Sequence, residues 1–136
     1  MAVRESVVSA AECNELDDIA GRFFAAVERG DVEAVRQIYA PDARIWHNFD
    51  NYASTREENL GVLRFVSNHV KGFRFEDVRR EFLPGAFLQR HVIRGVDEAG
   101  NEIVCPAMLR VDCRGGHIVR IEEYFDASQM PELGSE

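Results

Sequence analysis

Two polar side chains lie on what should be the inner face of a β-strand. The segment FLQRHVIRG, residues 87–95, alternates as a strand does, so successive side chains point to opposite faces of a sheet. One face carries Arg90 and Arg94, which favour water, and the other, with Gln89 and His91, is the predicted inner face. An imidazole titrates near neutral pH, so His91 is a candidate general acid or base. Gln89 can hold a carbonyl or a water, or can simply be a satisfied strand amide.

A carboxylate occupies a similar position in the segment HIVRIEEYF. Alternation places Glu123 with Ile121 and Phe125 on an apolar face. Burying a carboxylate is costly unless it is paired, and the imidazole of His91 is a suitable partner. We predict that Glu123 orients His91 and favours its charged form while burial opposes it, which leaves a base near its reference pKa of ~6.5. Such a dyad can remove a proton beside a carbonyl, activate water or protonate a leaving hydroxyl, and the alternative is a purely structural pair.

The segment Trp46, His47, Asn48 offers two arrangements. Strict alternation groups His47 with Ile45 and Phe49, and Trp46 with Asn48. A β-bulge would shift the facing by one residue and let neighbours share a pocket. We predict His47 as a second acid/base or substrate-binding group, with surface or core packing as the alternative, and Trp46 as a pocket wall.

The sequence predicts neither a metal nor an organic cofactor. His47, His69 and His91 come from separate elements and lack the short spacings of metal ligands. No phosphate-binding loop, GxSxG or dinucleotide fingerprint is present, and Cys105 falls on an apolar face as a packed thiol.

Charge and cysteine content limit the partners and the compartment. The net charge of -8 argues against nucleic acid and against anionic membrane surfaces. The N-terminus lacks the apolar core of a signal peptide, and no apolar run approaches ~20 residues. Three cysteines without a CxxC spacing predict reduced thiols in a cytoplasmic protein.

Three helices are expected in the N-terminal half. Apolar residues recur at helical spacing over 16–27, after a possible capping box of Ser9 with Glu12. Asp31 can cap a second helix, which Pro41 ends. The segment DNYAST is expected to be a polar loop. A third helix is expected after it, because Ser54 with Glu57 and Thr55 with Glu58 form two overlapping capping boxes.

The strands lie mostly in the second half. The segment ARIWHNF, residues 43–49, is the first, and from Lys71 onward four segments of period two are separated by PG, DEAGN and RGG. Such breaks predict an antiparallel meander. We therefore expect a single α+β domain over 1–136, with a core at about 12–127 and a loose tail at 128–136. A curled antiparallel sheet with three N-terminal helices on one face encloses a concave pocket.

The chain resembles the nuclear transport factor 2-like superfamily and, within it, the SnoaL-like group. The segments that carry the likeness are FFAAVERGDVEAVRQIYAPDARI and GGHIVRIEEYFD. The resemblance implies a cone-shaped fold that is shared by ketosteroid isomerases, limonene epoxide hydrolase, polyketide cyclases and non-catalytic members. It also implies homodimers formed sheet to sheet, with Val104, Met108 and Tyr124 as outward candidates for the contact.

The resemblance transfers some positions and not others. Against ketosteroid isomerases, His47 matches the general base and Phe23 matches an oxyanion-hole tyrosine. Their buried aspartate falls near Ala107 or Met108. Against limonene epoxide hydrolase, Trp46, His47 and Asn48 match the first-strand motif. There His91, Gln89 and Glu123 occupy the positions of an Asp-Arg-Asp relay, which argues for a site of that shape but against the same reaction.

We therefore expect a cofactor-independent isomerase, dehydratase or water-adding hydrolase acting on a mostly apolar terpene-, polyketide- or steroid-like molecule. The predicted catalytic residues are His91, Glu123 and His47. The predicted substrate contacts are Trp46, Asn48, Gln89, Phe23 and Met108. The alternative is a binding or dimerisation domain of the same fold without turnover.

Overall fold

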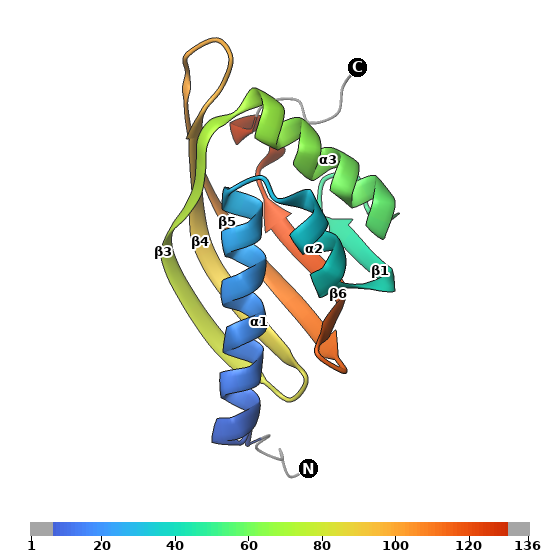
Figure 1. Ribbon diagram of the computed structural model, residues 1–136. Coiled ribbons are helices and arrows are strands. Elements are labelled where there is room, and N and C mark those ends of the chain that lie inside the picture. The colour runs from blue at the N-terminus through green and yellow to red at the C-terminus, as the bar shows by residue number, and fades with distance from the viewer. Residues whose placement is uncertain (1–6, 131–136) are drawn as a thin grey trace.

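The computed structural model describes residues 7–130, in which helices pack on one face of a curved six-stranded sheet (Figure 1). The helices are α1 (Ala10–Glu28), α2 (Val32–Ile38), α3 (Arg56–His69) and a short 3₁₀ turn, η1 (Ala127–Gln129). The strands are β1 (Tyr39–His47), β2 (Tyr52–Thr55), β3 (Lys71–Leu83), β4 (Ala86–Val96), β5 (Glu102–Arg114) and β6 (His117–Phe125). The predicted α+β class is confirmed.

The sheet is mixed, with the strand order β2-β1-β6-β5-β4-β3. Strands β3 to β6 form the predicted antiparallel meander. Strand β1 pairs parallel with β6, so the sheet is not wholly antiparallel as predicted. Turn signals identify strands joined by hairpins, whereas β1 and β6 are separated by the whole meander and carry no such signal.

The helix N-termini are capped as the sequence predicts. The Ser9 hydroxyl accepts a hydrogen bond from the amide of Glu12, and Asp31 caps α2. Thr55 and Glu58 form a reciprocal capping box at the start of α3. Each cap satisfies amides that have no partner inside their own helix.

Two local predictions are wrong. The segment predicted as a polar loop forms β2, a four-residue edge strand paired with β1, where its polar side chains meet solvent. Pro41 does not end α2, because the helix ends at Ile38 and Pro41 lies within β1. There the pairing with β6 shifts register between Tyr39 and Arg44, so the missing amide of proline breaks no regular ladder.

The core has two parts. The larger packs α1 and α2 on the sheet, with Phe23, Phe24 and Phe87 among its buried side chains. The smaller lies between the end of α3 and the strands β4 to β6 and includes Val66 and Ile93. Helix faces whose apolar residues recur every three or four positions bury those residues against the sheet, which fixes α1 and α3 over its curved face.

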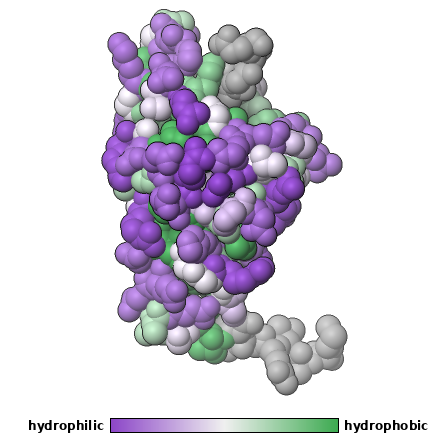
Figure 2. Space-filling view, turned by 45° about the vertical axis from the view of Figure 1, so that its right-hand side comes forward, coloured by the Kyte–Doolittle hydropathy of each residue, from purple (hydrophilic) through white to green (hydrophobic). Residues whose placement is uncertain are grey.

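The ends of the chain are described only in part. Residues 1–6 and most of the tail predicted to be loose lie outside the described residues. Within residues 7–130, Asp126 caps η1, and Met130 packs on the smaller part of the core. No helix in that range is long and apolar enough to cross a membrane. On the side that carries α2 and α3, hydrophilic residues dominate the surface (Figure 2).

Candidate functional site

A cavity of about 90 Å³ lies between the sheet and helices α1 and α3. Its wall is mostly apolar and draws on both parts of the core. The polar members of the wall are Tyr39, His47, Asn59 and Glu123. A mostly apolar cavity with a few convergent polar groups is the usual form of a small-molecule site.

His47 and Glu123 form a hydrogen-bonded pair in this wall. The parallel register of β1 and β6 sets His47 beside Glu123, as it sets Ile45 beside Ile121. The His47 Nε2 lies 3.1 Å from the Glu123 Oε1, and their side chains are 17% and 16% exposed. A carboxylate can only accept, so the Nε2 of His47 carries the proton. The alternation of β1 therefore turns His47 to the cavity.

His91 lies behind the cavity wall and is fully buried. It stands opposite Ala107 on β5, one strand away from β6, and reaches Glu123 diagonally across the sheet. Its Nε2 lies 4.0 Å from the Glu123 Oε2, beyond hydrogen-bond distance. The rings of Phe24 and Phe75 pack against it at 5.6 and 4.7 Å between centroids. Among the described residues, this Nε2 has no hydrogen-bond partner.

Gln89 holds the other nitrogen of His91. The Gln89 Nε2 lies 2.9 Å from the His91 Nδ1, and the Gln89 Oε1 accepts a hydrogen bond of 2.8 Å from the Arg80 Nε. The Arg80 guanidinium also donates to Asp17 of α1 at 2.5 Å. A line of polar contacts thus runs from the surface to the cavity through Asp17, Arg80, Gln89, His91, Glu123 and His47. We call these six residues the inner polar line.

Burial lowers the pKa of His91, Arg80 lowers it further, and Glu123 opposes the shift. Removing the ring from water disfavours its charged form more than the carboxylate favours it. His91 is therefore neutral at pH 7, rather than a base near its reference value.

Arg80 is one of the residues near the site that the sequence analysis did not identify. Continuing the alternation from Phe75 along β3 would turn Arg80 outward. The register shifts between Glu76 and Arg79, where Asp77 takes a positive φ of 55°. This bulge inserts one residue and brings Arg80 opposite Gln89 on the inner face. An aspartate that tolerates the left-handed conformation is the one local signal for it.

Tyr39 and Asn59 form a second polar pair in the cavity wall. The Tyr39 hydroxyl donates to the Asn59 Oδ1 at 2.7 Å. Burial, and next the negative charge of Glu123, raise the pKa of Tyr39, so the phenol stays protonated. The bond occupies the amide oxygen and leaves the N–H donors of Asn59 for other partners. The signal that could have revealed Asn59 is an amide on the apolar stripe of α3, four residues before Leu63.

The other predicted substrate contacts divide between the two faces of the sheet. Phe23 lines the cavity. Trp46 turns the other way, donates to the side chain of Asn51 and packs against Tyr124. Met108 is 42% exposed beside Tyr124 on the outer face, so it does not line the cavity. Side chains alternate along β5, and it is the neighbours Ala107 and Leu109 that face inward.

Asn48 acts at the end of β1 rather than in the cavity wall. Its side-chain oxygen accepts a hydrogen bond from the backbone amide of Phe125, and its backbone amide donates to the carbonyl of Glu123. Asn48 therefore extends the pairing of β1 with β6 past His47. These two bonds support the backbone on which Glu123 is carried.

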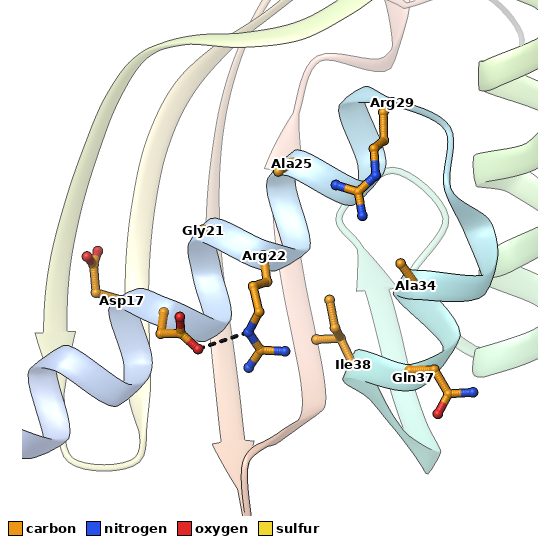
Figure 3. A pocket seen from close by; sticks show the side chains of 9 residues that line it. Asp17, Gly21, Arg22, Ala25, Arg29, Ala34, Gln37 and Ile38 are labelled. Carbon is orange, nitrogen blue, oxygen red and sulfur yellow. Dashed lines mark hydrogen bonds and ion pairs between the residues drawn. The ribbon is translucent and has the colours of Figure 1, made fainter.

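A larger groove of about 670 Å³ lies outside, between α1 and α2 (Figure 3). Arg22 of α1 and Arg29, the residue after α1, reach into it, and Arg22 pairs with Asp18 at 2.9 Å. The ion pairs of Arg22 with Asp18 and of Arg29 with Asp31 are exposed to water, and exposed pairs of this kind contribute little to stability. The smaller inner cavity, whose polar wall residues include the His47–Glu123 pair, is therefore the candidate site.

The described residues contain no cluster of three or more His, Cys, Asp or Glu arranged to hold a metal ion. Cys105 is fully buried, and burial raises the pKa of its thiol to about 11. A thiol that stays protonated at neutral pH is a poor nucleophile.

The model of the SnoaL-like domain matches residues 20–121. The chain belongs to the SnoaL-like domain family. This family is part of the nuclear transport factor 2-like superfamily, and the helices and curved sheet described above match the fold of that superfamily. No curated protein sequence matches the chain.

Solved structures share the fold at low identity. A hypothetical protein of Catenulispora acidiphila with a ketosteroid isomerase-like fold, in complex with trimethylamine, is 16% identical over 82% of this chain and 88% of its own, with a TM-score of 0.74. An LEH-like epoxide hydrolase of M. tuberculosis is 18% identical over 86% of both chains, with a TM-score of 0.72. IdmH of Streptomyces antibioticus, described as a proposed polyketide cyclase, is 22% identical over 84% of this chain and 94% of its own, with a TM-score of 0.74. These likenesses show the fold alone.

Proposed function

We propose that the protein is a cofactor-independent acid/base enzyme acting on a small, mostly apolar molecule in the inner cavity. The observation that carries the proposal is the hydrogen bond of 3.1 Å between His47 and Glu123 in an otherwise apolar wall. A paired carboxylate and imidazole inside a cavity can exchange protons with a bound molecule.

In this proposal Glu123 is the general base. His47 donates to the Oε1. The Oε2 lies 4.0 Å from the His91 Nε2, too far for a hydrogen bond, and can take a proton from a carbon beside a carbonyl or from a water. The protonated Glu123 then returns the proton to another carbon in an isomerisation, or to a leaving hydroxyl in a dehydration. The N–H donors of Asn59, in the same wall, can hold the oxygen of the substrate.

His91 takes a different part from the one expected from the sequence. Its neutral, buried ring suits a fixed donor behind Glu123 better than a base. The sequence analysis predicted His91 as the base and Glu123 as the group that orients it. In this proposal Glu123 is the base and His91 is the positioning group.

The size of the cavity limits the substrate. Sites for drug-sized ligands measure roughly 300–1,000 Å³, whereas this one measures about 90 Å³. A terpene, polyketide or steroid therefore enters only if side chains of the wall, such as Phe73 and Met130, move aside. Short enones, β-hydroxyketones and epoxides are the substrates to test first.

The experiment compares Glu123→Gln with Glu122→Gln against a panel of those substrates. Glu122 is the neighbour on β6 and pairs with Arg120 on the outer face. We expect a loss of about 10²–10⁴-fold in turnover for Glu123→Gln and none for the control. Wild-type turnover by Glu123→Gln would contradict the proposal. No turnover by the wild-type protein would favour the alternative, a binding domain without catalysis.

One observation favours a homodimer formed through the sheet, whether or not the protein is catalytic. The outer face exposes Val104, Met108 and Tyr124 at 40%, 42% and 51%, along two neighbouring strands. Large apolar side chains gathered on one face suit contact with another protein surface. Sedimentation of the wild-type chain and of Met108→Lys tests this, because the charge should shift a dimer toward monomer.

We also propose a cytoplasmic location. All three cysteines are free, as expected for a reducing compartment. Counting free thiols in protein purified without reductant checks this, and a disulfide-linked product would contradict it.

A further inference from the structure

Hydrogen-bond chemistry fixes the protonation of His91. The Nε of Arg80 can only donate, so the Gln89 atom 2.8 Å from it must be the amide oxygen. The amide nitrogen of Gln89 then faces the Nδ1 of His91 at 2.9 Å and donates to it. An Nδ1 that accepts carries no proton, so the neutral ring carries its proton on the Nε2. Charging His91 would set two N–H donors against each other.

The surroundings act in the same direction. Phe24 of α1 and Phe75 of β3 cover the ring, and Ala107 stands opposite it on β5, so these three neighbours carry no charge. The charged groups that face His91 are Arg80, through Gln89, and Glu123 on β6. Two further ionisable groups lie one contact beyond: Asp17 of α1 is bound to Arg80, and His47 of β1 is bound to Glu123.

The backbone of β3 is arranged for this contact. Gln89 pairs with Arg80 and Arg90 with Arg79, while Val92 pairs with Glu76. The bulge at Asp77 therefore lies directly across from His91 and is what turns Arg80 inward. Asp17 then holds the far side of the guanidinium, whose side chain is 18% exposed.

We propose that Arg80 and Gln89 are positioning residues that lock His91 as the neutral Nε2–H tautomer, a fixed donor directed at Glu123. We call Arg80, Gln89 and His91 the Arg80 lock. Glu123 thus lies between two imidazoles of different kinds: His47, hydrogen-bonded and partly exposed, and His91, buried and neutral. The catalytic consequence rests on the proposed function, since it assumes that Glu123 is the base, but the tautomer does not.

The direct test is nitrogen NMR of protein carrying ¹⁵N-labelled histidine, with the His91 signal identified by its loss in His91→Asn. In the wild-type protein we expect a protonated Nε2 and an unprotonated Nδ1 at neutral pH, and titration at a lower pH than that of an exposed histidine. A proton on the Nδ1, or titration like that of an exposed histidine, would overturn the proposal. This measurement uses the wild-type chain, so it does not depend on any variant folding.

Variants then test the cause. Gln89→Glu places a carboxylate beside the Nδ1, so the ratio of charged to neutral His91 should rise at least about tenfold. Arg80→Met frees the amide of Gln89 from its hydrogen bond, so the ratio of charged to neutral His91 should also rise. Arg79→Met removes the same charge from the exposed neighbour and should leave the signal unchanged. An unchanged His91 in both Gln89→Glu and Arg80→Met would overturn the lock.

The pH profile links the lock to catalysis. If turnover is found, Gln89→Glu should add an ionisation to the profile of kcat/KM that the wild-type profile lacks. Wild-type NMR as expected without any turnover contradicts the proposed function and leaves the lock standing. Turnover that depends on Glu123, together with the other tautomer of His91, contradicts the lock and leaves the proposed function standing.

Discussion

The inner and outer faces of the sheet both carry lines of charged and polar side chains, but the outer line is open to water and the inner one is largely buried. On the outer face, Arg110 pairs with Asp112 and Arg120 with Glu122, all between 28% and 45% exposed. On the inner face, His91 is fully buried. Water therefore screens the charged pairs of the outer face, whereas on the inner face burial lowers the pKa of His91.

This difference determines how much free energy of unfolding is lost when one partner of a polar contact is removed. An exposed ion pair can lose one member and regain its hydrogen bonds from water, at a cost of roughly 0.2–1 kcal/mol. A buried amide or imidazole has no such substitute, so a lost contact leaves a polar group unpaired. The predictions below compare the two faces, beginning with the largest expected effect.

The first prediction removes the centre of the Arg80 lock. Gln89→Leu leaves the Nδ1 of His91 without a donor and the Nε of Arg80 without an acceptor. We expect the free energy of unfolding to fall by about 1–3 kcal/mol, measured by urea denaturation. A variant as stable as the wild-type protein would mean that the inner polar line is no more demanding than the outer one.

The second prediction concerns the bulge that turns Arg80 inward. Asp77 has a φ of 55°, a conformation that a β-branched residue adopts poorly. Asp77→Val should lower the free energy of unfolding by about 1–3 kcal/mol, whereas Asp77→Gly should change it by less than about 0.5 kcal/mol. Equal effects of the two substitutions in thermal or urea unfolding would show that the conformation of Asp77 is not what matters.

The third prediction is a pH dependence of stability. Burial lowers the pKa of His91 below its ordinary value of 6.5, so below pH 6.5 the unfolded chain binds this proton more readily than the folded one. The contribution of neutral His91 is complete above pH 6.5 and is lost as the pH falls toward the lower folded pKa. Urea denaturation at a series of pH values should give a steeper decline for the wild-type protein than for His91→Asn. His117→Asn, at an exposed position, is the control, and equal slopes for wild type and His91→Asn would refute the prediction.

The smallest effect is expected on the outer face. Arg110→Ala removes an ion pair whose members are 45% and 28% exposed. We expect a change of less than about 0.5 kcal/mol in the free energy of unfolding, and no change in turnover. A loss as large as that of Gln89→Leu would erase the contrast between the two faces.

Period-two alternation was enough to predict part of the site. It turned Gln89 and His91 inward on β4 and Glu123 inward on β6, and it grouped His47 with Ile45. These strands keep a regular register where the site lies, so each side chain follows from its neighbours.

The rest of the site depends on contacts that no local pattern encodes. The parallel pairing that sets His47 beside Glu123 joins strands far apart in the chain. The bulge at Asp77 reverses the facing of β3, so Arg80 could not be identified by alternation. Met108 was expected at the pocket from family positions, yet it lies on the outer face with the even-numbered residues of β5.

The central claim is that His47 and Glu123 act as one unit on a substrate in the inner cavity. The most direct measurement is a double-mutant cycle in kcat/KM with His47→Asn, Glu123→Gln and the double variant, on whichever panel substrate the wild-type protein turns over. If the pair is one unit, the double variant loses no more than the worse single variant, about 10²–10⁴-fold. Losses that multiply in the double variant, or a Glu123→Gln variant as active as the wild type, would contradict the claim.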